Sequence, residues 1–489
     1  MKPYSPQRNH FNAMAPMKVH IFLHRLLPPP SVERQRRRVT RSLEYLSEPI
    51  VGRLVGPLRK SRFAKPTGWV KHTMGRLQLL FVGFAAIVAS STAVAGAEGL
   101  PETRLGRGIS LHEVLNWPEM KRDAQPTSYV WPPFANERYA LHKDELARLK
   151  QVGFDFVRLT VGLGIFLSAN EEQRKELDSI IVDRVSKLIG AGFSVVVDFH
   201  PISQDPRFPP VAFTRGPGQP LVEAFRGVLM RTAVNLSRLP RDRVVLEILN
   251  EPTTRDWSKS ENELWQSTEK SYFDSIRSVA PDLTLMVTGC CSCCGLELLA
   301  LDPSNYPGKN VYFTFHFYSP HAFTQQGSFD KKNLQASTRF LRNVPFPLDT
   351  DSLADVERRA RAGLEAENIE DVQTRLRAAR GVDVAVSRLR QFSRPDEIDS
   401  VFDKNLAWAR AHDVAPQRIF LGEFGVMRPN VDPASRHNWL KTVREAAERR
   451  NMPWAYWSLE QPSAMGLRID RGTGAFDPLI LDALGMAGQ

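Results

Sequence analysis

Eight short segments rich in β-branched and aromatic residues recur along this chain, and stretches with helical spacing separate most of them. The eight segments are RGISL (107–111), FDFVRLT (154–160), SVVVDFH (194–200), RVVLEILNE (243–251), LTLMVTG (283–289), VYFTFHFY (311–318), IFLGEFG (419–425) and PWAYWSL (453–459). Apolar strands alternating with helices favour a parallel sheet that is buried on both faces. Eight units predict an α/β fold, a closed (β/α)8 or TIM barrel.

An open doubly wound sheet is the competing architecture. It would carry a glycine-rich phosphate loop after its first strand, and none follows RGISL. The helices after the fifth and seventh segments are the least clear of the pattern. The stretch between the sixth and seventh segments is much longer than one loop and one helix require. Its residues 350–392 are highly charged and have helical spacing. We therefore predict a helical insertion over 328–395, in a loop that opens on the catalytic face of a barrel.

Positive charge is concentrated before the barrel. Residues 1–76 hold 16 Lys and Arg against 3 Asp and Glu, whereas the remainder holds 49 against 51. Residues 1–73 show neither helical nor strand periodicity, so we expect a disordered basic extension. A protein acting on nucleic acid or membranes through this extension is one alternative function. The near-neutral body argues against a nucleic-acid partner.

Residues 74–97 have the features of an export signal. The apolar run over 79–89 is shorter than the ~20 residues that span a bilayer. Small residues follow it, and Ala93-Val94-Ala95 fits the pattern cut by signal peptidase. We expect a periplasmic or secreted protein with its folded domain over 98–489. The alternative is an uncleaved signal anchor, the one case in which a membrane would be a partner.

Polar residues and one tryptophan stand at or near the ends of the predicted strands. They are Arg158, His200, Asn250, Glu251, His316, Tyr318, Glu423 and Trp457. In a barrel, the carboxyl ends of the strands form the catalytic face. Two glutamates at one pocket push their pKa values apart, leaving one protonated and one ionised. Such a pair suits glycoside cleavage, in which one carboxyl protonates the leaving oxygen and the other attacks the anomeric carbon. We expect Glu247, deeper in its strand, to be structural.

The motifs VRLT, VVVDFH, LEILNEP, FHFYSPHAFTQQG, FLGEFG and WAYWSL resemble glycoside hydrolase family 5, the cellulase family of retaining β-glycanases. The resemblance covers most of residues 100–485 and implies that Glu251 is the acid/base and Glu423 the nucleophile. It implies substrate-binding roles for Asn250 beside the scissile bond and for His316 and Tyr318, which orient Glu423 and the sugar. Arg158 and His200 would complete the polar floor, and Trp457 would be the stacking platform. The long insertion departs from the minimal family barrel.

The resemblance favours an endo-β-1,4-glucanase acting by double displacement. Mannan, xyloglucan or an exopolysaccharide remain alternative substrates, and a non-catalytic polysaccharide-binding barrel is an alternative function. A degenerate barrel would be expected to lose a glutamate, whereas both are present. We expect a β-glycan as partner, no cofactor, no metal, no nucleic acid and a monomer.

All four cysteines, Cys290, Cys291, Cys293 and Cys294, lie in the loop after the fifth segment. Zinc sites usually take two separated C-x₂-C pairs, whereas these two pairs interlock. Neighbouring cysteines bridge with strain, and disulfides persist in exported proteins. We expect a local disulfide such as Cys290–Cys294, or thiols that shape the loop, in preference to a metal site.

Overall fold

The computed structural model describes residues 103–486 except 122–127, 257, 291–294, 329–337 and 462–463. The predicted basic extension and export signal lie outside these residues. Among the described helices, none combines the length and the apolar character needed to cross a membrane.

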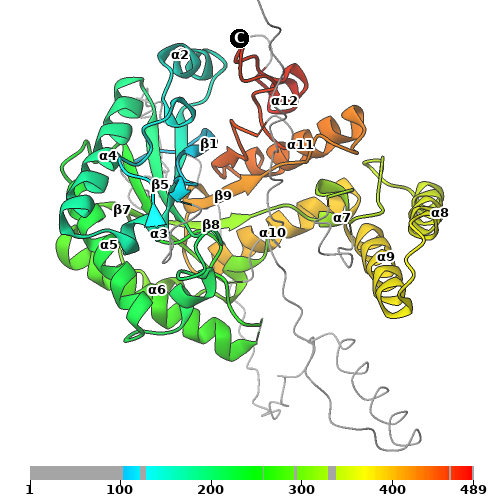
Figure 1. The fold of residues 1–489 in the computed structure, drawn as a ribbon, viewed down its shortest axis with the longest axis horizontal. Helices are drawn as coiled ribbons and strands as arrows, with labels where there is room; N and C mark the ends of the chain where they lie inside the picture. The colour runs from blue at the N-terminus through cyan, green and yellow to red at the C-terminus, as the bar shows by residue number, and fades with distance from the viewer. Residues whose placement is uncertain are drawn as a thin grey trace, which may run out of the picture. The chain divides into compact units, whose positions relative to one another are not determined.

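Eight parallel strands form a closed barrel, which confirms the predicted fold (Figure 1). The strands are β1 (Arg107–Leu115), β4 (Phe156–Gly162), β5 (Ser194–His200), β6 (Val244–Glu247), β7 (Thr284–Thr288), β8 (Val311–His316), β9 (Ile419–Phe424) and β10 (Trp454–Tyr456). Each pairs with the next in the chain, and β1 closes the barrel by pairing with both β10 and β4. A short antiparallel pair, β2 (Met120–Lys121) and β3 (Ser128–Tyr129), lies outside the barrel sheet.

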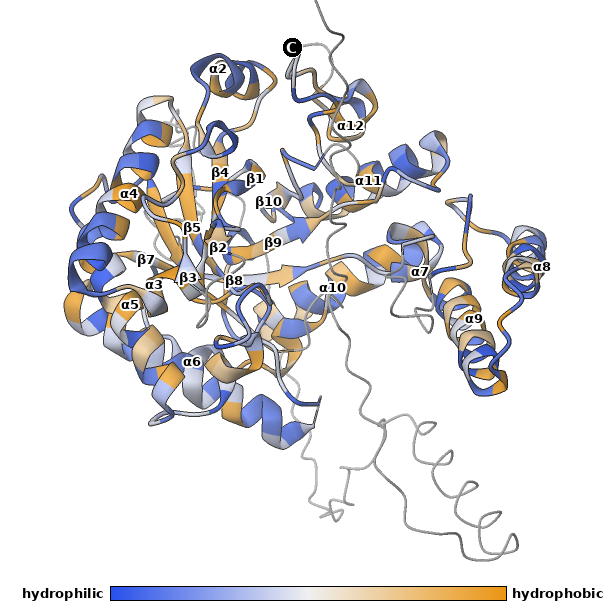
Figure 2. Ribbon diagram, in the orientation of Figure 1, coloured by the Kyte–Doolittle hydropathy of each residue, from blue (hydrophilic) through white to orange (hydrophobic). Residues whose placement is uncertain are grey.

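Helices surround the strands and pack their apolar faces on the barrel, except for the pair α8 and α9, which lies to one side (Figures 1 and 2). The helices are α2 (Lys143–Gln151), α3 (Leu163–Ser168), α4 (Glu171–Gly190), α5 (Pro220–Leu236), α6 (Lys259–Val279), α7 (His321–Thr324), α8 (Thr350–Ala366), α9 (Val372–Phe392), α10 (Pro395–Ala411), α11 (Pro433–Glu448) and α12 (Pro478–Ala483). The helix that was expected after the fifth strand is replaced, within the described residues, by two 3-10 turns at Glu297–Ala300 and Pro303–Asn305.

One apolar layer fills the interior of the barrel toward the amino ends of its strands. It takes one buried residue from each of seven strands: Phe156, Val196, Val245, Met286, Tyr312, Phe420 and Ala455. Strand β1 contributes Gly108, where an added Cβ would lie 2.1 Å from the Phe156 ring, so glycine leaves room for that ring. Successive inward residues in a strand are two apart. The next inward residues toward the carboxyl ends therefore include Arg158, Asp198 and Glu247, which form a polar layer above the apolar one.

The register corrects one detail of the sequence prediction. Arg158 does not end its strand, because β4 continues to Gly162. Arg158 pairs in register with Ser110 and Val196 and is fully buried. Its guanidinium therefore belongs to the floor of the site rather than to the rim.

The long connection between β8 and β9 contains the predicted helical insertion. Helices α8 and α9 form a pair beside α7 (Figure 1). Asp349 and Asp371 cap their amino ends by accepting hydrogen bonds from Ser352 N and Thr374 N. The backbone N of Leu348 donates to O of Ser393 at 3.0 Å, so the chain enters and leaves the pair at adjacent points.

Candidate active site

Arg158 lies at the centre of the polar layer and holds two glutamates. Its Nε and Nη2 donate to the two carboxylate oxygens of Glu247 at 2.7 and 2.8 Å. Its Nη1 donates to Oε1 of Glu423 at 2.7 Å. Nη2 also lies 2.8 Å from Oδ1 of Asn250 and 3.0 Å from Oδ2 of Asp198. The expected structural role of Glu247 is thus a bidentate clamp on the arginine.

Glu423 owes its inward direction to an irregularity in β9. The pairing with β8 shifts between Phe315 and His316, so that His316 faces Glu423. The intervening residue is Gly422, where an added Cβ would lie 2.8 Å from Nε2 of His316. Tyr318 OH donates to Oε2 of Glu423 at 2.8 Å. Together with Arg158, this bond fixes both oxygens of the carboxylate.

Glu251 enters the site from the loop that follows β6. Its backbone φ is +38°. Residues other than glycine rarely adopt this conformation, and it recurs at functional sites. Nδ1 of His316 lies 2.9 Å from Oε1 of Glu251 and 3.5 Å from Oε2 of Glu423. A carboxylate oxygen of Glu251 and one of Glu423 lie within 4.8 Å of each other. The two carboxyls therefore share one pocket, with His316 between them.

A second set of contacts orients His200 and Asn250. Nδ1 of His200 lies 2.9 Å from Oδ2 of Asp198, and its Nε2 lies 3.4 Å from Nδ2 of Asn250. Asp198 thus joins His200 to Arg158. Asp198 was not among the predicted site residues, although it stands two residues before His200 on the same face of β5, so the strand period indicates it.

Aromatic side chains form one wall of the site. The ring of Trp457 stacks on that of His200, with centroids 5.4 Å apart and an interplanar angle of 16°. His112, on β1, lies 4.5 Å from Trp457 by ring centroids, and its Nε2 accepts a hydrogen bond from Nε1 of Trp117 at 2.8 Å. Neither His112 nor Trp117 was among the predicted site residues. Because β1 was expected to end at residue 111, His112 was placed beyond the strand.

Burial sets the protonation of these groups. Burial raises the pKa of Glu423. Electrostatic interactions with His316 and Arg158 oppose this rise, and the interaction with Glu251 adds to it. Burial raises the pKa of Asp198 to about 7. Burial also lowers the pKa values of His200 and His316 to about 4, so both imidazoles are neutral near pH 7.

Burial alone would also lower the pKa of Arg158. The charges of Asp198, Glu247 and Glu423 outweigh this effect, so that the pKa of Arg158 lies well above its ordinary value. The site therefore keeps one permanent cation beneath several carboxyls. That cation stabilises the ionised form of Glu423.

One group of described residues could also share a metal ion, namely Glu251, His316 and Glu423. Hydrogen bonds from Arg158 and Tyr318 already engage both oxygens of Glu423, and His316 Nδ1 is within hydrogen-bonding distance of Glu251. A metal would have to displace these partners. The three groups are thus engaged with protein partners, and the expectation of no metal stays a prediction.

The eight residues predicted from the sequence thus meet in one site, with Asp198, Glu247 and His112 as additional members. The cysteine loop gives less information, because Cys291, Cys293 and Cys294 lie outside the described residues. Cys290 is 3% exposed, and its Sγ lies 3.1 Å from Oδ1 of Asn262. The predicted disulfide stays a prediction.

Comparisons with known proteins match this chain to one family. The family model described as cellulase (glycosyl hydrolase family 5) matches residues 116–463. Endoglucanase 3 of Fibrobacter succinogenes is 22% identical over 333 residues, which are 65% of this chain and 46% of that protein. The chain thus spans less than half the length of this curated relative.

Solved structures share the fold. The cellulose synthase subunit Z of Clostridioides difficile has a TM-score of 0.52 at 23% identity, over 78% of this chain and 99% of that one. A family 5 xyloglucanase from Paenibacillus pabuli has a TM-score of 0.54 at 15% identity, over 79% of this chain and 99% of that one. The family model covers most of the described barrel and both glutamates. The chain belongs to glycosyl hydrolase family 5, the cellulase family.

Proposed function

We propose that this protein is a retaining glycoside hydrolase that cleaves β-linked polysaccharide, with β-1,4-glucan as its first substrate class. The observation that carries the proposal is the approach of Glu251 and Glu423, whose oxygens come within 4.8 Å. Retaining enzymes hold their carboxyls ~5–5.5 Å apart, whereas inverting enzymes need ~6.5–9.5 Å to admit a water molecule. The short spacing favours direct attack by one carboxylate on the sugar.

Glu423 is the nucleophile in this mechanism. Arg158 and Tyr318 bind its two oxygens, so the carboxylate is ionised and held in one orientation. It attacks the anomeric carbon and forms a glycosyl-enzyme ester as the glycosidic C–O bond breaks. Arg158 cannot deprotonate at any working pH, so it balances the charge of Glu423 before attack and after the ester is hydrolysed.

Glu251 is the acid/base. It gives its proton to the departing glycosidic oxygen, and then takes a proton from the water that hydrolyses the ester. The neutral imidazole of His316 lies between the two glutamates and aligns Glu251. Asn250, held by Arg158, offers its amide beside the scissile bond, and the partly exposed Trp457 offers its ring to a sugar face.

The choice of β-1,4-glucan and of endo action rests on the family and on the relative named endoglucanase 3. Mannan, xyloglucan and exopolysaccharide are the alternative substrates. A barrel that binds polysaccharide without cleaving it is the alternative function. The presence and contacts of both glutamates favour catalysis over binding alone.

The test is release of new reducing ends by residues 98–489 from a panel of soluble β-glycans, with Glu423→Ala beside it. We expect release from at least one polymer and loss of release in the variant. Proton NMR of the first products should show the β-anomer before mutarotation. An α-anomer would contradict double displacement, and binding without release would favour the non-catalytic alternative.

A second pair of measurements separates the two glutamates. An aryl glycoside with a good leaving group needs little protonation, so Glu251→Ala should retain much more activity on it than on polymer. Glu423→Ala should be inactive on both, because no leaving group replaces the nucleophile. The reverse pattern would exchange the two roles.

A further inference from the structure

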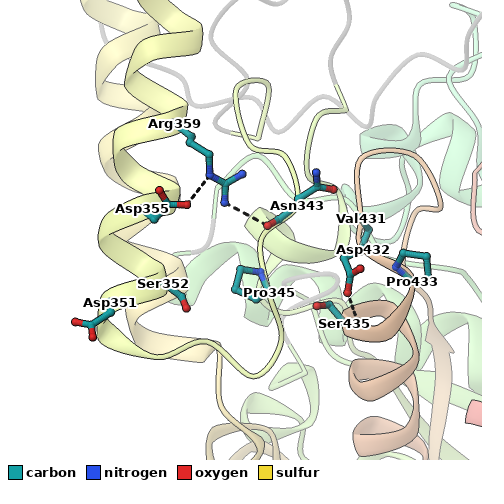
Figure 3. Close-up of a pocket in the computed structure, with 10 residues that line it drawn as sticks. All are labelled: Asn343, Pro345, Asp351, Ser352, Asp355, Arg359, Val431, Asp432, Pro433 and Ser435. Carbon is teal, nitrogen blue, oxygen red and sulfur yellow. Dashed lines mark hydrogen bonds and ion pairs between the residues drawn. The ribbon is translucent and has the colours of Figure 1, made fainter.

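The insertion forms a second hollow, outside the active site. Its volume is about 720 Å³, within the range of ~300–1,000 Å³ that is typical of ligand pockets. Figure 3 shows side chains of α8 on one side and the start of α11 on the other. The lining residues are Asn343, Pro345, Asp351, Ser352, Asp355, Arg359, Val431, Asp432, Pro433 and Ser435.

Both walls of this hollow are held by hydrogen bonds. Arg359, on α8, donates from Nε to Oδ2 of Asp355 at 2.8 Å and from Nη1 to O of Arg342 at 2.7 Å (Figure 3 shows the first of these). Asn343 N donates to O of Asn430 at 2.8 Å, which joins the insertion to the loop after β9. Asp432 caps α11 by accepting from Ser435 N at 2.9 Å. The hollow is therefore a formed site rather than a gap between loose segments.

Ser435 points to a ligand. The residue is 6% exposed, and its side chain faces the hollow (Figure 3). Within the described part of the chain, its hydroxyl makes no hydrogen bond. This hydroxyl is not among the enclosed side-chain atoms that lack a partner, so it opens onto the hollow, where a bound molecule can reach it as donor and acceptor.

The loop after β9 connects the hollow to the active site. It begins directly after the strand that carries Glu423, and Met427 in this loop packs with Tyr318 and Trp457. Met427 N donates to O of Thr324 at 2.9 Å. The same loop reaches Val431 and Asp432 in the wall of the hollow. Both sites therefore lie at the carboxyl end of the barrel.

The lining selects the class of ligand. It has three carboxylates and one guanidinium, and that guanidinium is already engaged, so the hollow repels anions. Carboxylate, hydroxyl and amide groups on facing walls suit a molecule with many hydroxyls. Pro345, Val431 and Pro433 add small apolar surfaces for the C–H faces of a sugar. The three carboxylates are not among the described groups that are close enough to share one cation.

We propose that this hollow is an accessory binding site for an uncharged stretch of glycan, separate from the catalytic pocket. The identity of the ligand rests on the proposed function, because a polymer held in the active site extends beyond it. The hollow would retain a polymer between cuts. A short substrate that fills only the catalytic pocket would not reach it.

The test measures retardation of the protein in native gels that contain neutral hydroxyethylcellulose, all in the Glu423→Ala background. The variant of the hollow, called the groove variant below, combines Asp432→Asn with Ser435→Ala. Asparagine at position 432 keeps a good helix cap. The matched control is Asp371→Asn with Thr374→Ala, at the capped start of α9 and outside the hollow. We expect roughly three- to tenfold weaker binding for the groove variant, as for one or two lost hydrogen bonds, and no change for the control.

Equal retardation of the groove variant and the control would overturn the proposal. Carboxymethylcellulose, an anionic probe, should bind no more weakly to the groove variant than to the control, because the carboxylates of the hollow repel it, and weaker binding of it to the groove variant would also overturn the assigned ligand class. The outcomes are separable from the proposed function. Loss of the groove effect while the parent protein hydrolyses glycan rejects the accessory site alone. Groove-dependent retardation with no hydrolysis of any polymer rejects catalysis alone.

Discussion

Arg158 determines how many carboxyls this barrel can bury. Three of them, Asp198, Glu247 and Glu423, lie within ion-pair distance of its guanidinium, and all four side chains are at most 5% exposed. Buried charges are stable when they are paired and hydrogen-bonded. The same cation therefore supports both the fold and the proposed nucleophile, so the two contributions must be separated by experiment.

Arg158→Met should destabilise the protein most at high pH. Burial already raises the pKa values of the three carboxyls, and without the cation they rise further above their unfolded values. A raised folded pKa contributes stability below the unfolded pKa, and that contribution is lost as pH rises through the folded pKa. We expect a loss of ~3–5 kcal/mol near pH 8 and a smaller loss near pH 5, measured by thermal unfolding at both values.

Arg231→Met is the control for this experiment. Arg231 pairs with Asp178 at the surface, where ion pairs contribute ~0–1 kcal/mol. Its effect should be small and similar at both pH values. An Arg158 variant whose loss of stability is equal at pH 5 and pH 8 would contradict the proposed charge balance.

Tyr318→Phe should move the acidic limb of kcat/KM to higher pH. Burial already raises the pKa of Glu423, and the Tyr318 hydroxyl stabilises the ionised carboxylate through a 2.8 Å bond. Its removal raises that pKa further, so that less Glu423 is ionised at a given low pH. We expect a shift of about one pH unit upward, measured on an aryl glycoside.

Tyr272→Phe provides the comparison, since its buried hydroxyl donates to O of Phe213 outside the active site. This variant should lose some stability and keep the pH profile of the parent. An unchanged acidic limb in Tyr318→Phe would mean that another group controls the limb.

At the scale of elements, the two ends of the insertion lie close enough to be joined directly. The contact between Leu348 N and Ser393 O allows residues 349–392 to be replaced by a short glycine linker. We expect the barrel to fold and to keep its rate on a short aryl glycoside. Activity on polymer should fall, because α8 supplies one wall of the accessory hollow. The comparison is made on the polymer that the parent cleaves best.

A double variant, Val372→Gln with Leu376→Gln, controls for altered surface. These α9 side chains are 54% and 48% exposed and lie outside the hollow, so polymer activity should be unchanged. Excision that leaves the rates on both substrates intact would show that the insertion takes no part in glycan handling.

The pattern of apolar segments predicted the existence and order of the strands better than their ends. Ile248 and Leu249 are buried as deeply as β6 and extended the predicted strand, although regular pairing ends at Glu247. Single backbone bonds continue from Ile248 N to O of Met286 and from Asn250 N to O of Phe199, so the sequence predicted the course of the chain better than the end of the regular strand. Seven of the eight predicted site residues were identified because each is polar within or beside an apolar run, and Trp457 was identified by its place near the end of the last one. Asp198 met the same criterion, but nothing in the sequence indicated its contact with Arg158.

At the scale of the whole molecule, charge divides the chain into a basic beginning and a near-neutral barrel. Residues 1–76 hold 16 Lys and Arg against 3 Asp and Glu. Basic segments before an apolar run stay on the cytoplasmic side during export. We propose that the barrel is exported and acts outside the cytoplasm, and that the basic segment takes no part in catalysis.

This proposal predicts a mature amino terminus just after Ala95 in protein recovered from the exported fraction. Signal peptidase accepts small residues at the positions of Ala93 and Ala95, so Ala95→Phe should block cleavage and keep the protein in the membrane fraction. Ala97→Ser, which changes a residue beyond the expected cut, is the control and should be processed like the parent. Amino-terminal sequencing and intact mass make the measurement. A mature terminus upstream of residue 90 would reject cleavage and favour a signal anchor, in which case the barrel would work at a membrane surface.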